Sequence, residues 1–284
     1  MEQPHICFDR IIPAKYQAGK TSAHRNALSA FETAVRERSA SLPNPPAKDA
    51  PFHEHLHAVE SQHELSATDP IEIARMAVIN AKKWDNGKHL RCKFLDGDDF
   101  QRKTVQEKAT EWLKYANVSF EFVKDGDAEI RISFQADPGS WSAVGQDCLN
   151  ADYFKKDEPT MNFGWLRDDT DDEEYTRVVV HEFGHALGCI HEHQSPKEHL
   201  KWNKAAVYAA FSGPPNNWSK DDIDHNILEK YSPHGISTTL FDRKSIMLYQ
   251  FDASLFTDHK GTPLNTDLST KDKHMIKRMY PKSA

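Results

Sequence analysis

The chain has 284 residues, of which 38% are hydrophobic and 28% charged, and its formal net charge is −7. This length suits one sizeable domain with an extension, or two small domains. The acidic balance argues against a nucleic-acid partner, which would require a basic surface. No apolar run reaches the about 20 residues of a membrane helix, and residues 1–20 lack the apolar core of a signal peptide. We therefore expect a protein without a membrane partner that is cytoplasmic or exported by a non-classical route.

Residues 1–66 differ in composition from the rest of the chain. Apolar side chains at helical spacing predict a helix over residues 18–38, and the proline-rich stretch from Ser39 to Pro51 resembles a linker. The cluster from His53 to His57 offers metal-binding groups, but a solvated polar tract explains it better because no other ligand group accompanies it. We therefore divide the chain into an N-terminal extension, residues 1–66, that is a candidate pro-segment, and a main domain, residues 67–284.

The main domain begins with helices and strands in alternation. Asp69 and Glu72 predict a helix start, since they form a capping box around a proline at the first helical position. Residue periodicity then predicts a strand over 90–95, a helix over 99–116, and strands over 118–122 and 130–134.

Two further strands are predicted over Trp141–Cys148 and Met161–Leu166, before a helix over 176–190. The acidic run Asp168–Glu174 between them could bind calcium through its carboxylates. Acidic side chains also stabilise the positive start of a helix, and we favour this explanation. Shorter helices are predicted over 204–211 and 219–231, and a last helix begins at the capping box Ser269–Asp272. This order of elements indicates an α+β fold.

The most specific signal lies at the end of the predicted helix 176–190. Residues 181–191 have the spacing H-E-x-x-H-x-x-G-x-x-H. His181 and His185 lie one turn apart on the same helix face. Gly188 has the backbone freedom to end the helix there, so that His191 can approach the point that His181 and His185 face. Three imidazoles that leave a fourth position open are typical of a catalytic zinc site.

A second motif, Ser245-Ile246-Met247-Leu248-Tyr249, lies downstream. The long histidine motif followed by a methionine turn is the signature of metzincin metalloproteases. Glu192, directly after the third histidine, and Tyr249, two residues after the methionine, resemble the astacin-like family. Leu248 stands where that family usually has histidine, and the segment after Glu192 lacks the Arg and Asp residues of animal astacins. The chain thus looks more like the microbial and fungal branch, from about Trp84 to Pro281.

This resemblance implies a zincin-like fold: a twisted, mostly antiparallel sheet, an active-site helix and a less regular C-terminal subdomain. It implies Zn²⁺ held by His181, His185 and His191, and Glu182 as the general base of peptide hydrolysis. It also implies Tyr249 as a candidate fifth ligand and transition-state donor, with Met247 as an apolar floor beneath the histidines. In the family, the residue matching Glu192 anchors the amino terminus of the mature enzyme, which would require cleavage of the N-terminal segment.

The predicted function is therefore a zinc-dependent endopeptidase that hydrolyses extended protein or peptide substrates, with Trp141–Gly145 pairing with the substrate backbone. The alternatives are a peptidase of short peptides or of one dedicated protein, a latent or catalytically silent zinc protein that binds extended peptides, and a structural zinc site. Glu182 argues against a silent binder, which needs no base. Structural zinc sites usually fill all four positions and often use cysteine.

Two other features carry no assigned role. Phe94–Asp98 resembles the inhibitory F-x-G-D motif of family pro-segments, but it follows a predicted strand inside the fold. The four cysteines have no paired spacing, so we expect reduced thiols. The sequence does not indicate an oligomeric state.

Overall fold

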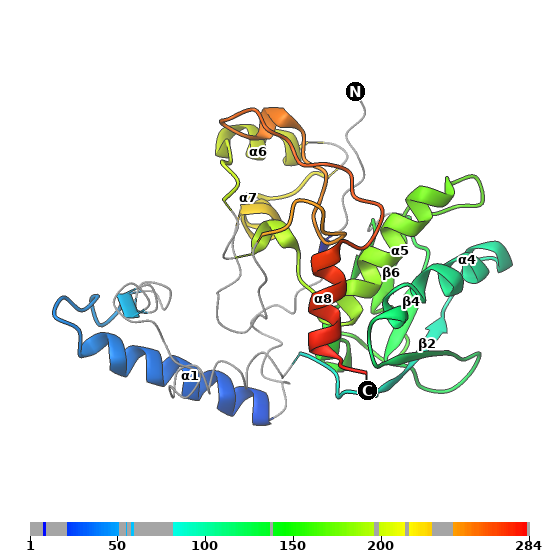
Figure 1. The fold of residues 1–284 in the computed structure, drawn as a ribbon, viewed down its shortest axis with the longest axis horizontal. Helices are drawn as coiled ribbons and strands as arrows, with labels where there is room; N and C mark the ends of the chain where they lie inside the picture. The colour runs from blue at the N-terminus through cyan, green and yellow to red at the C-terminus, as the bar shows by residue number, and fades with distance from the viewer. Residues whose placement is uncertain are drawn as a thin grey trace.

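The computed structural model describes residues 8–9, 22–50, 55, 58–59, 82–136, 139–195, 199–213, 216–228 and 241–282. The described residues between 82 and 282 supply five strands of a six-stranded sheet, its packed helices and a C-terminal half of short helices and turns, and residues 8–9 supply the sixth strand (Figure 1). The predicted α+β, zincin-like class is confirmed. The helix start at Asp69 and the boundary between residues 66 and 67 lie outside the described residues. None of the described helices is long and apolar enough to cross a bilayer.

The sheet has the strand order β1-β5-β6-β4-β2-β3. Its strands are β1 (Phe8–Asp9), β2 (His89–Phe94), β3 (Ser119–Phe122), β4 (Ile130–Ser133), β5 (Trp141–Ser142) and β6 (Met161–Asn162). Among these described strands only β5 and β6 pair antiparallel, whereas the pairs β1–β5, β2–β3, β2–β4 and β4–β6 are parallel. The prediction of a mostly antiparallel sheet is therefore wrong.

The parallel pairing follows from the connections between the strands. Helix α4 (Asp99–Ala109) lies between β2 and β3 and forms the crossover that parallel neighbours require. The turn at Gly126 does not close a hairpin, because β3 and β4 pair with opposite edges of β2. The sequence showed a helix and a turn between these strands, but not which strands would become neighbours.

One face of the sheet is buried by helices. In β2 and β4, the buried residues Leu90, Cys92 and Ile132 alternate with partly exposed charged residues. Helices α4 and α5 (Asp172–Ala186) pack against each other, and the ring of Phe183 in α5 lies 4.9 Å from that of Phe120 in β3. The hydrophobic core therefore lies between the sheet and α5, the helix that carries the histidine motif.

Several elements are shorter than predicted. The helix over 99–116 ends at Ala109, because the Thr110 hydroxyl donates to the Glu107 carbonyl and the chain continues as the 3₁₀ helix η2 (Trp112–Lys114). Strand β5 stops at Ser142, and Gly145, with a φ of +53°, begins the 3₁₀ helix η3 (Gly145–Leu149). The other described elements are α1 (Ser22–Ala40), η4 (Glu192–Gln194), α6 (Lys204–Phe211), α7 (Lys220–Ile223), the π-helical turn η5 (Asp224–Leu228), η6 (Ala253–Leu255) and α8 (Thr270–Met279).

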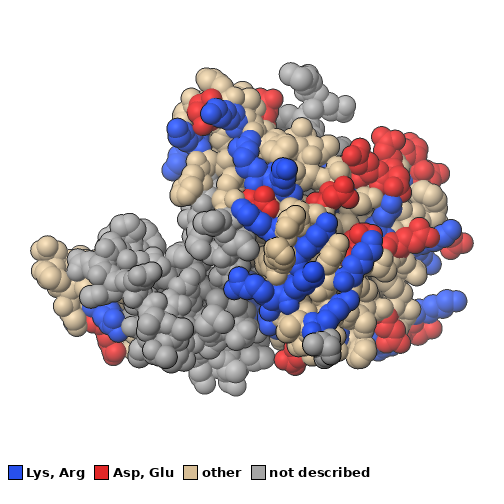
Figure 2. Space-filling view, viewed as in Figure 1, with Lys and Arg blue, Asp and Glu red and all other residues tan. Residues whose placement is uncertain are grey.

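The acidic run belongs to the start of α5, which begins four residues before the predicted Thr176. Asp172, Glu173 and Glu174 form the first turn of α5, where negative charge is favourable. Figure 2 shows acidic side chains gathered at the upper right, over this end of the helix, and basic side chains in a band across α8. Glu174 pairs with Arg177 at 2.6 Å. These contacts support the helix-start explanation of the run.

Helix α8 is tied to the methionine turn by one carboxylate. Ser269 and Asp272 form the predicted capping box of α8. The Asp272 carboxylate also accepts hydrogen bonds from the Ser245 hydroxyl at 2.7 Å and from the Ile246 backbone at 2.9 Å. Burial raises the pKa of Asp272, while its bonds from Ser245, Ile246 and Ser269 act in the opposite direction. The turn is thus fixed by a buried carboxylate from the end of the chain.

We expect Asp272→Ala to lower the free energy of unfolding by about 3 kcal/mol, because it leaves buried donors without an acceptor. Asp222 is a matched control, since it closes the capping box of α7 but is exposed. Asp222→Ala should cost about 1 kcal/mol or less. Urea unfolding followed by circular dichroism measures both, and equal losses would show that the turn contacts of Asp272 add nothing.

Candidate active site

The end of α5 brings the third histidine of the motif back toward the first two. Gly188 has a φ of +92°, in the left-handed region that favours glycine. The Cys189 backbone donates to the Gly184 carbonyl at 2.9 Å, and that of Gly188 to His185 at 2.7 Å. This pattern is a Schellman motif, which ends a helix and reverses its direction. The predicted turn at Gly188 is therefore confirmed.

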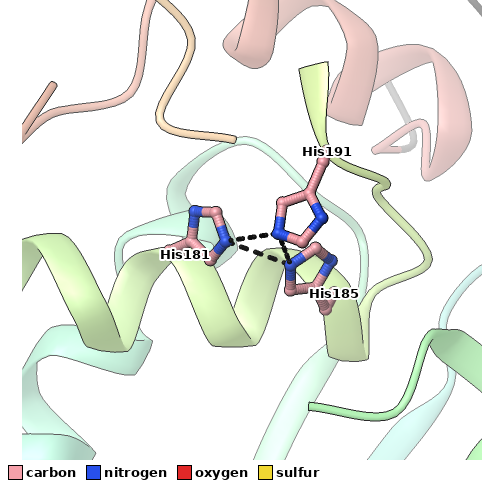
Figure 3. A group of neighbouring side chains, drawn as sticks. All are labelled: His181, His185 and His191. Carbon is pink, nitrogen blue, oxygen red and sulfur yellow. Dashed lines mark hydrogen bonds between the residues drawn. The ribbon is translucent and has the colours of Figure 1, made fainter. Parts of the chain in front are cut away.

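The three histidines of the motif meet at one point, as Figure 3 shows. The Nε2 atoms of His181, His185 and His191 lie 3.1 Å apart in each of the three pairs. All three side chains are buried. Among the described residues, they form the one group of three or more His, Cys, Asp or Glu side chains close enough to hold a metal ion.

The donor set fits zinc. The Nδ1 atoms of His181 and His185 lie 2.8 and 2.9 Å from the carbonyls of Ile246 and Cys189. A carbonyl only accepts, so Nδ1 carries the hydrogen in both rings and Nε2 keeps a lone pair for a metal. Burial first, and then the neighbouring His185 and His191, hold the pKa of His181 well below its ordinary value, which favours the neutral form. Tetrahedral zinc would set its nitrogen ligands about 3.3 Å apart, close to the observed spacing.

Tyr249, the last residue of the methionine-turn motif, packs against the histidine triad. Its ring centroid lies 4.1 Å from that of His191 and 5.4 Å from that of His181. Its hydroxyl lies 3.5 Å from Nδ1 of His191, the nitrogen that does not face the other two histidines. The structure thus brings the predicted Tyr249 to the site, with its hydroxyl beside the outer nitrogen of a triad member.

Met247 lies directly under α5. A Cβ atom added to Gly184, between the two helical histidines, would come within 2.5 Å of the Met247 Sδ. The Met247 side chain is buried, and its carbonyl accepts from the Glu192 backbone at 2.9 Å. Met247 is therefore the apolar floor that the sequence predicts, and the glycine leaves room for it.

The two glutamates of the motif differ in surroundings. Glu182 is fully buried on α5, next to His181. The Glu192 carboxylate accepts from the Asp242 backbone at 2.7 Å. Burial raises the pKa of Glu192 to about 7, against the lowering effect of that hydrogen bond. In this structure the described partner of Glu192 is thus a backbone amide of the chain itself.

The sequence did not point to two residues that support the site. Asp272 was predicted only as a helix cap, although the turn that it holds carries the Ile246 carbonyl bound by His181. Gln194 had no predicted role, yet its side-chain oxygen lies 3.4 Å from Nδ1 of His191. Its position three residues after His191 is the one local signal that could have suggested this contact.

Three cysteines lie in the described residues. Cys92, Cys148 and Cys189 are free and buried. Burial raises the pKa of each thiol well above its ordinary value. Cys189 takes part in the site through its backbone carbonyl, which is bound to His185. Cys7 lies outside the described residues.

Comparisons with known proteins agree with this geometry. The family model of matrixin, a peptidase family, matches residues 83–225. This range contains the histidine motif and ends before the methionine turn. A search of curated proteins found no match.

Two solved structures of myroilysin are similar to the chain. The first is 40% identical, with a TM-score of 0.70, and the match covers 72% of this chain and 98% of that one. The second is 41% identical, with a TM-score of 0.57, and covers 71% and 86%. A hatching enzyme zinc-protease from medaka fish (Oryzias latipes), high choriolytic enzyme 1, is 17% identical with a TM-score of 0.47, covering 72% and 96%.

The matrixin match spans half of the chain, and the myroilysin match covers nearly all of that protein at high identity. Together with the histidine triad, they confirm the metzincin class that the two motifs predicted. The chain belongs to the metzincin zinc metalloproteases and is a zinc-dependent peptidase that acts on protein or peptide substrates.

Proposed function

We propose that the protein is an endopeptidase in which His181, His185 and His191 hold the zinc ion through their Nε2 atoms. The observation that carries this assignment is the convergence of the three Nε2 atoms, with the outer nitrogens of His181 and His185 fixed by carbonyls. When bound, zinc supplies a Lewis acid that makes water more acidic and polarises a peptide carbonyl. The remaining chemistry falls to Glu182 and Tyr249.

Glu182 is the proposed general base. It follows His181 directly on α5 and is buried beside the triad. Its carboxylate takes a proton from the attacking water and then delivers that proton to the leaving amine. A buried base adjacent to a metal ligand has a short path to the water, which supports this role.

Tyr249 is the proposed donor to the substrate. Its ring packs against His181 and His191, so its hydroxyl is close to the triad. A hydroxyl there can donate a hydrogen bond to the carbonyl oxygen as negative charge develops on it. The role of Tyr249 as a fifth zinc ligand is not part of this proposal, because its hydroxyl lies beside Nδ1 of His191 and not beside the converging Nε2 atoms.

Glu182→Gln tests the base. We expect kcat to fall by about 10²- to 10⁴-fold, because an amide cannot accept the proton. Zinc content and the circular dichroism spectrum should stay at the parental values. Hydrolysis of a quenched peptide library, with zinc measured on the same sample, provides the test. Parental turnover in this variant would exclude Glu182 as the base. A zinc-loaded parent that stays inactive even after residues 1–66 are removed would favour the silent zinc protein.

Tyr249→Phe tests the donor. We expect kcat to fall by about 10²-fold with a smaller change in KM, because the hydrogen bond forms as charge develops. Tyr208→Phe is a control, since the Tyr208 hydroxyl donates to Asp224 and not to a residue of the triad. Steady-state kinetics on one peptide measure both variants. A change in KM alone would mean that Tyr249 orients the substrate.

The proposed substrate site is the edge of β5. This strand pairs with β6 on one side, so its other edge can accept an extended peptide by strand addition. In the structure, that edge is paired with β1, in the register Phe8 to Trp141 and Asp9 to Ser142. Residues Phe8 and Asp9 therefore occupy the edge that we propose for the substrate backbone.

This pairing supports a pro-segment role for residues 1–66. A strand from the same chain is present at high effective concentration, so it competes strongly with substrates. The full-length chain is then a latent form, and displacement or removal of the segment exposes the β5 edge.

Phe8→Pro in the full-length chain tests latency. Proline weakens a strand because it has no backbone donor. We expect the initial rate of peptide hydrolysis to rise by up to about tenfold, which corresponds to the loss of about one backbone hydrogen bond. Phe8→Ala keeps the backbone donor and serves as the control. An unchanged rate in the proline variant would contradict the blocking role of β1, and equal activation by alanine would assign it to the side chain.

A further inference from the structure

The three histidines differ in what holds their outer nitrogens. Those of His181 and His185 donate to backbone carbonyls, whose positions are set by the path of the chain. Nδ1 of His191 faces two side chains instead, with the Gln194 Oε1 at 3.4 Å and the Tyr249 hydroxyl at 3.5 Å. Two side chains therefore lie where they can orient the His191 ring.

Gln194 is well placed to orient this ring. It ends the 3₁₀ turn η4, and its backbone donates to the His191 carbonyl at 3.1 Å, which folds its side chain back toward His191. The side chain is buried, so water does not readily replace it. An acceptor at the outer nitrogen of a metal-binding histidine fixes the tautomer and the direction of the ring.

The Tyr249 hydroxyl, the second acceptor, is also the proposed donor to the substrate. Nδ1 carries a single hydrogen, so Gln194 and Tyr249 compete for it. A Tyr249 hydroxyl that is bound to this nitrogen stays beside the outer edge of the His191 ring. If Gln194 accepts the hydrogen, the hydroxyl is released for the substrate.

We propose that Gln194 is the positioning residue of His191: its side-chain oxygen accepts the Nδ1 hydrogen, directs Nε2 toward the metal, and releases the Tyr249 hydroxyl from the same nitrogen. This inference rests on the proposed function, in which His191 binds zinc. According to this inference, part of the zinc affinity of the site depends on Gln194. It also gives a role to the glutamine that lies three residues after His191.

The two acceptors act as substitutes for each other. In Gln194→Met, Tyr249 becomes the remaining side-chain acceptor, so the ring is held less well and the hydroxyl is retained. In Tyr249→Phe, Gln194 still holds the ring, so zinc affinity stays close to that of the parent. In the double variant, both of these acceptors are lost, and we expect affinity to fall by more than the product of the two single effects.

The experiment measures the zinc dissociation constant of the full-length protein by competition with a chromogenic chelator, and the visible spectrum of the Co²⁺-substituted protein. Gln194→Met removes the acceptor at similar size, and Gln194→Glu keeps an acceptor there. Gln101→Met is the matched control, because Gln101 is also buried and hydrogen-bonded, at 2.7 Å to the Leu166 carbonyl, but lies on α4.

We expect Gln194→Met to weaken zinc binding by about tenfold or more and to change the Co²⁺ spectrum. Gln194→Glu should stay within about threefold of the parent or bind more tightly, because a carboxylate is the stronger acceptor. Gln101→Met should leave both readouts unchanged even if it lowers stability. These results support the proposal, and tighter zinc binding in Gln194→Glu than in the parent does so even if the methionine variant does not fold.

Three outcomes overturn the proposal: zinc affinity within twofold of the parent in Gln194→Met, equal weakening in Gln194→Met and Gln101→Met, or weaker binding in Gln194→Glu than in Gln194→Met. His191→Ala separates this inference from the proposed function. If that variant binds zinc as tightly as the parent, the assignment of the metal site fails. If it loses zinc while Gln194→Met does not, only the role of Gln194 fails.

Discussion

The structure depends on holding three imidazoles with their Nε2 atoms toward one point. Nε2 atoms 3.1 Å apart in a buried site repel one another unless a cation lies between them. The fold therefore has to fix each ring through contacts to its Nδ1 atom. It does so with a carbonyl from the methionine turn, a carbonyl from the end of α5, and side chains that follow His191 in sequence or approach it from the turn.

This requirement explains why distant parts of the chain meet at α5. The methionine turn has to bring the Ile246 carbonyl to His181 and the Met247 side chain under Gly184. The turn is short and irregular, so it has few backbone hydrogen bonds of its own. Asp272, at the start of the last helix, supplies the missing acceptors. The precision of the metal site thus depends on a carboxylate far away in sequence.

The same sheet that supports α5 also offers the proposed substrate edge. A strand edge is a surface of unpaired backbone groups, and it binds any extended chain that reaches it. In this protein β1 pairs with β5 through Phe8 and Asp9. The edge that we propose for the substrate is therefore already paired with residues Phe8 and Asp9 of the same chain.

The sequence by itself determined what depends on neighbours a few residues apart: the helix that carries His181 and His185, the turn at Gly188, and the capping box of α8. Hydrogen bonds along a helix and the freedom of glycine act over that range, so spacing alone was sufficient. Only the tertiary structure decided which strands are neighbours, that β1 covers β5, and that Asp272 and Gln194 support the site. Those contacts depend on which surfaces pack together. The mostly parallel sheet shows that the helices and turns between strands do not reveal which strands become neighbours.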